Sequence, residues 1–212
     1  ISTGLVGSEM CIRDRSFIDA LFESISGLTT TGATVFTNLE DLPKSILYYR
    51  QQLQWLGGIG IVVIAVSILP MIGVGGMQIY KAETPGPIKD TKLTPRIAET
   101  ANALFKIYVF LTVVCAIAYW VAGMSWFDAL SHSFSTISIG GFSTYDESLG
   151  HFDNNAVLTI ASIFMVVSGL NFALHYTAWH ARSIKSYISD PEARLFVLVI
   201  LFGILVTTYF LY

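Results

Sequence analysis

Two short segments rich in threonine and glycine hold the residues of this chain best suited to chemistry. We call residues 30–34 the first loop and residues 139–143 the second loop. Backbone carbonyl oxygens in such segments can replace the hydration shell of a cation when several loops form a ring, and glycine leaves room for close approach. Because neither loop contains a carboxylate, we expect a carbonyl mechanism that suits a weakly hydrated monovalent cation.

The two loops belong to an internal repeat with an offset of 109 residues and no gap. Residues 16–34 recur, altered, as residues 125–143. The identical pairs are Ser16/Ser125, Asp19/Asp128, Ala20/Ala129, Leu21/Leu130, Ser24/Ser133, Ser26/Ser135 and Gly32/Gly141. Repetition at a fixed offset is the signature of a repeated structural unit.

A helix too short to cross a bilayer is expected before each loop. Residues 17–28 give roughly 18 Å of helix at 1.5 Å per residue, whereas the bilayer core is about 30 Å thick. Ser125 and Asp128 predict a capped N-terminus with a carboxylate in the positive first turn, as do Ser16 and Asp19. Irregular backbone after such a re-entrant helix is tolerated at membrane depth only where it lines a water-filled path or is buried in protein. We therefore expect both loops to line a pore.

The composition indicates a membrane protein. Of the 212 residues, 53% are hydrophobic and only 13% are charged, whereas a soluble domain carries about 25% charged residues. No basic block or stripe is present, which argues against a nucleic-acid partner. Cys11 and Cys115 form neither a disulfide framework nor a zinc-binding spacing, and Cys115 is expected to be a small buried hydrophobe.

Four long apolar segments predict membrane-spanning helices at about 46–79, 104–124, 156–181 and 195–212. Glycines at 57, 58 and 60 indicate close helix contact or a bend, since small residues let backbones approach in lipid. Asn171, inside the third segment, is expected to pair with another helix. Tyr119, Trp120 and Trp126 match an aromatic belt at the membrane surface.

The cationic residues predict the orientation in the membrane. Two connectors that lie on one side carry eight of them: Lys81, Lys89, Lys92, Arg96, Lys106, Arg182, Lys185 and Arg194. Outside the first 15 residues, the opposite side carries only Lys44 and Arg50. The positive-inside rule places both connectors in the cytoplasm and both loops on the outer side. Arg50 either extends to the interface or ties the loops to their support, and His132, His175 and His180 are expected to be packed or interfacial.

The chain resembles the TrkH/KtrB family of potassium transporters, most of all its bacterial TrkH branch, from about Phe17 to its end. The resemblance rests on residues 22–24 and 27–34, on Tyr49-Arg50-Gln51 with Gln54-Trp55, and on residues 73–78, 85–87, 95–100 and 139–144. It implies an all-α polytopic membrane protein built of repeated span, re-entrant pore helix and span units, as in potassium channels. The potassium-binding filter positions that it implies are Thr30, Thr31, Gly32, Ile139, Gly140 and Gly141.

The resemblance also predicts how the chain is divided. Residues 16–80 would hold the pore helix, loop and second span of repeat one, and residues 81–100 a cytoplasmic connector. Residues 101–185 would form a complete repeat two, and residues 186–212 the first span of a truncated repeat three. Residues 1–15 are set apart, because residues 10–15 resemble one reading frame of a sequencing-library adapter.

The expected function is therefore potassium uptake across the inner membrane by a multi-pass protein, with potassium as substrate and no tightly bound cofactor. The resemblance implies a homodimer and a cytosolic, nucleotide-binding regulatory subunit of the TrkA type, together with membrane lipids. The sequence leaves open whether flux is channel-like or coupled to protons or sodium, and which nucleotide the regulator binds. The alternative is a polytopic membrane enzyme with re-entrant loops as structural support; the sequence has no His-Glu-x-x-His motif for it.

Overall fold

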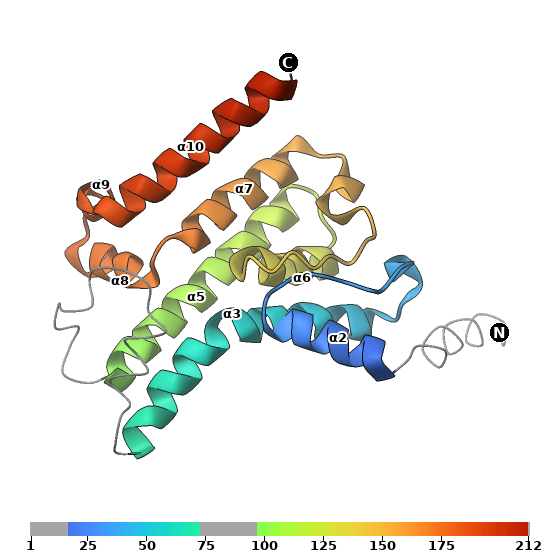
Figure 1. Ribbon diagram of the computed structural model, residues 1–212, viewed down its shortest axis with the longest axis horizontal. Coiled ribbons are helices and arrows are strands. Elements are labelled where there is room, and N and C mark those ends of the chain that lie inside the picture. The colour runs from blue at the N-terminus through green and yellow to red at the C-terminus, as the bar shows by residue number, and fades with distance from the viewer. Residues whose placement is uncertain (1–16, 73–96, 212) are drawn as a thin grey trace.

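The structure, a computed structural model, describes residues 17–72 and 97–211, with side chains described for 17–60 and 102–211. Every regular element in these ranges is a helix (Figure 1). The longer helices are α2 (Phe17–Leu28), α3 (Lys44–Ile72), α5 (Ile97–Val121), α6 (Trp126–Ile137), α7 (Asn155–Gly169), α8 (Phe172–Ala181) and α10 (Pro191–Leu211). Short turns η1 (Leu39–Asp41), η3 (Ser148–Phe152) and α9 (Lys185–Ser189) lie between them. The predicted all-α class is confirmed for these residues, whereas the segment 1–15 and most of the connector 81–100 lie outside them.

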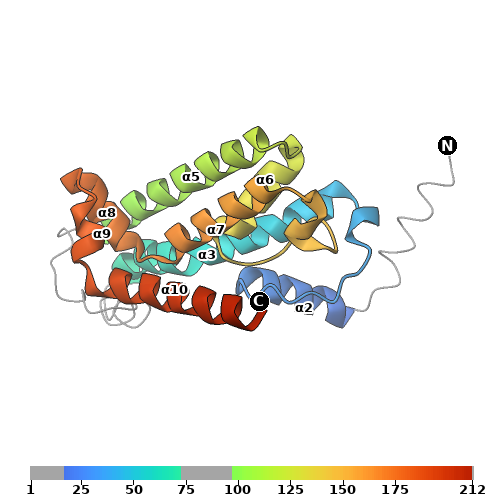
Figure 2. The ribbon, with the colours of Figure 1, turned by 90° about the horizontal axis from the view of Figure 1, so that it is seen from above.

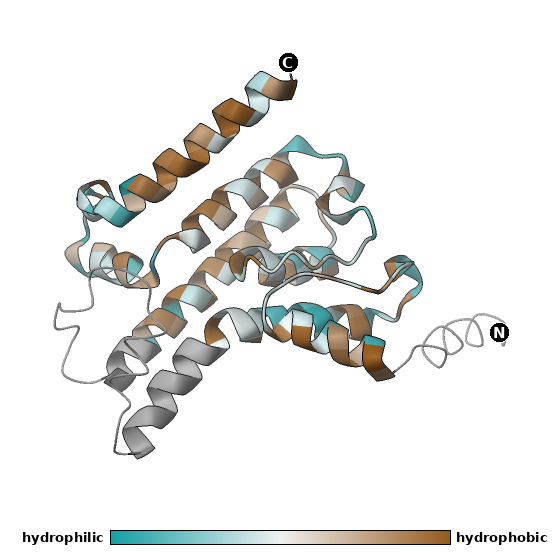
Figure 3. Ribbon diagram, viewed as in Figure 1, coloured by the Kyte–Doolittle hydropathy of each residue, from teal (hydrophilic) through white to brown (hydrophobic). Residues whose placement is uncertain are grey.

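Two of the described helices are long and apolar enough to cross a membrane. They are Asn102–Val121, which is most of α5, and the whole of α10, and the bent pair α7 and α8 would bring the number to three. Figure 3 shows α10 apolar over most of its length, and Ala193 is the one residue of this helix that is buried within the described structure. A helix that is hydrophobic all round suits a lipid or protein environment rather than water.

The segment 156–181, predicted to span the membrane, is not one continuous helix, because the chain breaks between α7 and α8 and turns by 90°. Leu170 is extended, with φ −75° and ψ 151°, which ends the first helix. The Asn171 side chain then accepts a hydrogen bond from the backbone N–H of Ala173 and caps the second. The contact that the structure gives the Asn171 side chain is therefore with its own helix, where an Asn at an N-cap satisfies a backbone donor; its pairing with another helix stays a prediction.

The two short helices, each of 12 residues, occupy different surroundings. Helix α6 packs against α5, α3 and α7, and nine of its residues are buried. Helix α2 lies along α3 (Figures 1 and 2) and buries only Glu23, Ser26 and Gly27. Its apolar side chains, including Leu21, Phe22 and Ile25, remain exposed.

The core lies between α3, α5, α6 and α7. A buried cluster of Ile59, Tyr108, Cys115, Tyr119, Met124, Ala129, Ile137, Val157 and Ala161 forms it. Cys115 is buried as expected. Close helix contact is confirmed at Gly57 and Gly58: a Cβ on Gly57 would overlap the Leu28 backbone, and one on Gly58 would lie 2.8 Å from Ser138 Cβ. Tyr119 is wrongly assigned to the aromatic belt, because it is fully buried and its hydroxyl bonds Thr136 Oγ1 at 2.7 Å. Trp120 and Trp126 are exposed as predicted.

Candidate functional site

Both short helices end with the same backbone geometry. The N–H of Thr31 donates to the Ser26 carbonyl at 2.9 Å, and at the 109-residue offset the N–H of Gly140 donates to the Ser135 carbonyl at 2.9 Å. The preceding N–H groups, of Thr30 and Ile139, reach carbonyls three residues back at 3.0 and 3.2 Å. These paired bonds are those of a Schellman C-terminus. The internal repeat therefore extends from the sequence to individual hydrogen bonds.

The loops that follow share an unusual backbone course. Thr30 and Ile139 have φ angles of 54° and 53°, and two residues later Gly32 and Gly141 have φ angles of 75° and 83°. Thr30 and Ile139 are β-branched, for which positive φ is a genuine outlier. Such strain costs on the order of 1–3 kcal/mol per residue and concentrates at functional sites. Both loops therefore hold a strained conformation that their surroundings must maintain.

The two loops touch each other. A Cβ atom on Gly32 would overlap the carbonyl oxygen of Gly140, so the loops approach backbone to backbone at this point. Gly32 is thus required both by this approach and by its positive φ. Gly141 is required by its φ alone, since nothing lies within 4 Å of the position of its Cβ.

Each loop is braced by a side chain at an equivalent position of its short helix. Glu23 accepts a hydrogen bond from the Thr34 hydroxyl at 2.8 Å and one from the Val35 N–H at 3.2 Å. At the 109-residue offset, His132 Nε2 bonds the Ser143 hydroxyl at 3.0 Å, and its Nδ1 lies 2.9 Å from the Asp128 carbonyl. One brace is an anion and the other an imidazole, yet both fix the same hydroxyl position of the loop.

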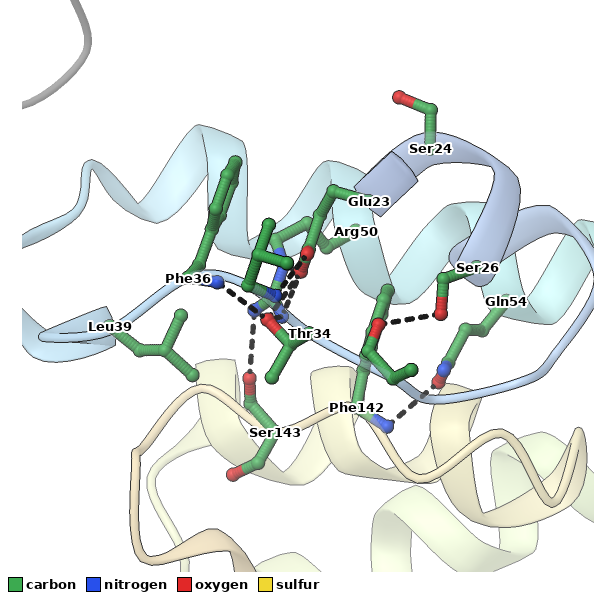
Figure 4. A network of polar contacts seen from close by, with 12 residues as sticks. Glu23, Ser24, Ser26, Thr34, Phe36, Leu39, Arg50, Gln54, Phe142 and Ser143 are labelled. Carbon is green, nitrogen blue, oxygen red and sulfur yellow. Dashed lines mark hydrogen bonds and ion pairs between the residues drawn. The ribbon is translucent and has the colours of Figure 1, made fainter. Parts of the chain in front are cut away.

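Arg50, on α3, joins the two loops (Figure 4). Its Nη2 forms an ion pair with Glu23 Oε1 at 2.6 Å, and its Nε donates to the same oxygen at 2.8 Å. Nη1 donates to the Ser143 carbonyl at 3.2 Å, and Nη2 to the Thr34 hydroxyl at 3.2 Å. The guanidinium also lies 4.3 Å from the centre of the Phe142 ring. Of the two expectations for Arg50, the tie between the loops and their support is confirmed.

Gln54, one turn after Arg50, contacts the second loop through both atoms of its side-chain amide. Its Nε2 donates to the Gly140 carbonyl at 2.8 Å, and its Oε1 accepts from the Phe142 N–H at 3.1 Å. Figure 4 shows this amide directed from α3 toward the second loop. Because Gln54 is fully buried, both bonds are shielded from water.

The outer ends of the loops are tied by carboxylates. Asp128 accepts hydrogen bonds from Ser125 at 2.6 Å, from Thr144 at 3.1 Å and from the Tyr145 hydroxyl at 3.3 Å. Burial, and then the Asp128 carboxylate, raise the pKa of Tyr145 above its ordinary value. Asp146 accepts from the backbone N–H groups of Asn38 at 2.8 Å and Leu39 at 3.1 Å, which links the segment after the second loop to the one after the first.

The structure brings the six predicted filter residues together in two adjoining loops, with Gly32 against Gly140. Sequence reasoning did not assign Glu23 or Gln54 a role, although both lie in the stretches that carry the family resemblance. Ser125 caps α6 as predicted, because its side chain accepts from the Asp128 N–H at 3.2 Å. His132 and His175 are buried and hydrogen-bonded, as expected.

The sequence of this chain is similar to those of known membrane transport proteins. Residues 9–211 match the family described as TrkH, cation transport protein. The Trk system potassium uptake protein TrkH of Halomonas elongata is 62% identical over 190 residues, which are 90% of this chain and 39% of that protein. The protein of the same name from Escherichia coli K12 is 60% identical over 179 residues, 84% of this chain and 37% of its own length.

A solved structure is similar as well. The crystal structure of the potassium transporter TrkH from Vibrio parahaemolyticus matches with a TM-score of 0.73 at 52% sequence identity. The match covers 90% of this chain and 38% of that one. The chain therefore spans about two fifths of the length of the curated relatives that it matches.

Proposed function

Because the chain belongs to the TrkH family of cation transport proteins, we propose that it forms part of the pore of a potassium uptake protein in the cell inner membrane. The observation that carries this proposal is the pair of strained loops with one backbone course, set against each other at Gly32 and Gly140. Potassium is the transported substrate, and the proposal needs no tightly bound cofactor.

The oxygens that would replace the water around potassium come from the two loops. The proposed positions are Thr30, Thr31, Gly32, Ile139, Gly140 and Gly141. Each loop follows the C-terminus of a short helix, where the helix dipole places partial negative charge that favours a cation. Neither loop carries an ionised side chain, so the attraction comes from carbonyl dipoles, which suit a weakly hydrated monovalent ion. The chain would supply two adjacent walls of a ring.

We further propose that the functional unit is a homodimer with a cytosolic nucleotide-binding regulatory subunit. The relatives are named as proteins of a Trk system, which is consistent with more than one component. The cationic connectors at 81–106 and 182–194 would face this subunit from the cytoplasmic side. A polytopic membrane enzyme is not favoured, because the relatives are named as uptake proteins.

The proposal is tested by rubidium uptake in potassium-starved cells that express the full-length transporter with this segment. We expect uptake to exceed that of cells without the transporter and to be competed by potassium more strongly than by sodium. Gly32→Leu should abolish uptake, since a side chain there would overlap the Gly140 carbonyl. Gly150→Leu is the matched control, because nothing lies within 4 Å of the position of its Cβ. Intact and selective uptake by Gly32→Leu would contradict the assignment.

A further inference from the structure

The second loop, which belongs to repeat two, is held by side chains of α3, a helix of repeat one. Arg50 and Gln54 lie four residues apart on α3 and so share one face of that helix. Together they bind the Gly140 carbonyl, the Phe142 N–H and the Ser143 carbonyl. The exposed fractions of Arg50 and Gln54 are 3% and 0%. Most of the second loop is therefore fixed to a single buried surface.

Gly140 is a glycine because of Gln54. Its φ is not positive, unlike those of its neighbours Ile139 and Gly141. A Cβ at Gly140 would instead lie 2.5 Å from Gln54 Oε1 and 2.8 Å from Gln54 Nε2, which is closer than real Cβ contacts. The amide of Gln54 thus occupies the space that a side chain at 140 would need.

The Gln54 amide fixes the direction of one carbonyl in the loop. With Nε2 bonded to the Gly140 oxygen at 2.8 Å, that carbonyl is directed toward α3 and the first loop. Ile139 and Gly141, on either side, have positive φ angles, and both are exposed on the surface of the described structure. Holding the middle carbonyl therefore constrains where the two flanking carbonyls point.

We propose that Gln54 is a positioning residue that sets ion selectivity, an inference that rests on the proposed potassium path. Gln54 turns the Gly140 carbonyl away from the ion. Of the six proposed filter positions, Gly140 then serves as the link between Ile139 and Gly141, and the carbonyls of these two residues face the ion. In the described structure, this contact between α3 and the second loop has no equivalent on α7, at the positions that correspond to Arg50 and Gln54. At the same 109-residue offset, α7 carries Thr159, which bonds its own helix backbone at 2.8 Å, and Ile163, which is exposed.

Gln51 provides a matched control on the same helix. It is fully buried like Gln54, yet neither atom of its amide has a hydrogen-bond partner among the described residues. Replacing it with an apolar residue of similar size removes a buried amide without releasing the loop. Gln51→Met and Gln54→Met therefore make the same chemical change, and only the second breaks the contact with the second loop.

The test measures rubidium uptake and its competition by sodium in the full-length transporter, with membrane abundance followed by immunoblot. We expect Gln54→Met to lower the preference for rubidium over sodium about tenfold, since two buried hydrogen bonds that order the loop are lost. Gln51→Met should keep the wild-type ratio. A purely structural role for Gln54 would reduce abundance and maximal uptake together while leaving the ratio unchanged, and that result would overturn the proposal.

A second variant keeps the test valid if Gln54→Met misfolds. Gly140→Ala should displace the Gln54 amide and lower the preference for rubidium over sodium. The double variant Gly140→Ala with Gln54→Ser should be no less selective than Gly140→Ala or Gln54→Ser alone, because all three lose the same contact. Additive losses would contradict a shared mechanism. Wild-type protein that carries no rubidium would refute the proposed function, whereas selective wild-type uptake with an unchanged ratio in Gln54→Met and Gly140→Ala would refute only the role of Gln54.

Discussion

Removing the Arg50 side chain should destabilise the site more than removing the charge of its partner. The Arg50 and Glu23 side chains are 3% and 4% exposed, and they are joined by an ion pair and a hydrogen bond at 2.6 and 2.8 Å. In Arg50→Met, the Glu23 carboxylate stays buried with only the Thr34 hydroxyl and the Val35 N–H as recorded partners. Breaking a buried pair from one side costs roughly 3–5 kcal/mol.

Neutralising Glu23 is the milder change. In Glu23→Gln the amide oxygen still accepts from Arg50 or Thr34, and Arg50 keeps its bond to the Ser143 carbonyl. We expect a loss of about 1–3 kcal/mol, which is typical for a weakened buried hydrogen bond. The double variant Arg50→Met with Glu23→Gln contains no unpaired charge, so it should be more stable than the sum of the single losses by roughly 2 kcal/mol.

The assay is equilibrium unfolding of the full-length transporter in detergent, followed by tryptophan fluorescence, for the wild type and these three variants. Lys44→Met is the control, because Lys44 begins the same helix but is exposed, with only a cation–π contact at 5.3 Å to Phe127. Lys44→Met should lower the free energy of unfolding by no more than about 1 kcal/mol. If the losses of unfolding free energy for Arg50→Met and Glu23→Gln sum to that of the double variant within about 0.5 kcal/mol, the two residues do not interact and the buried pair is refuted.

Three further variants test the supports of the loops. Ser125→Ala removes the side chain that caps α6, and unfolding should show a loss of about 1 kcal/mol; no loss would place the start of α6 elsewhere. Gly141→Ala should reduce rubidium uptake less than Gly32→Ala, since its Cβ meets only an unfavourable φ of 83° and no neighbouring atom; the reverse order would contradict the contact between the loops. Asp146→Ala frees two backbone N–H groups of the outer segment, and amide hydrogen exchange at Asn38 and Leu39 should accelerate, whereas unchanged protection would show that Asp146 does not hold them.

The repeat and its short helices could be predicted because they depend on residues that are close together in the sequence. An identical spacing of Ser, Asp and Gly at one offset defines both helix starts and both loops, and the Ser125 cap follows from residue type alone. The positive φ angles of Gly32 and Gly141 follow in the same way. These features depend on neighbours within a few residues, where sequence patterns are most informative.

The contacts between repeats could not be predicted, because they join residues far apart in the chain. The hydrogen bond between Gln54 and Gly140 joins residues 86 positions apart, and the one between Arg50 and Ser143 joins residues 93 positions apart. The spacing of polar and apolar residues in the sequence does not indicate such pairs. The break between α7 and α8 was missed because residues 156–181 contain no Asp, Glu, Lys, Arg or Pro that would mark it. The division shows only in the backbone of Leu170 and in the capping geometry of Asn171. Tyr119 was misplaced because its position along α5 does not reveal which face meets α6.

The central claim is that the two loops bind potassium through backbone oxygens. The most direct measurement is anomalous diffraction from crystals of the full-length transporter soaked with rubidium or thallium. We predict an anomalous peak beside both loops, within coordination distance of the carbonyls of Ile139 and Gly141 and of the first loop around Gly32. A bound ion elsewhere in the molecule, with no peak beside these two loops, would contradict the account.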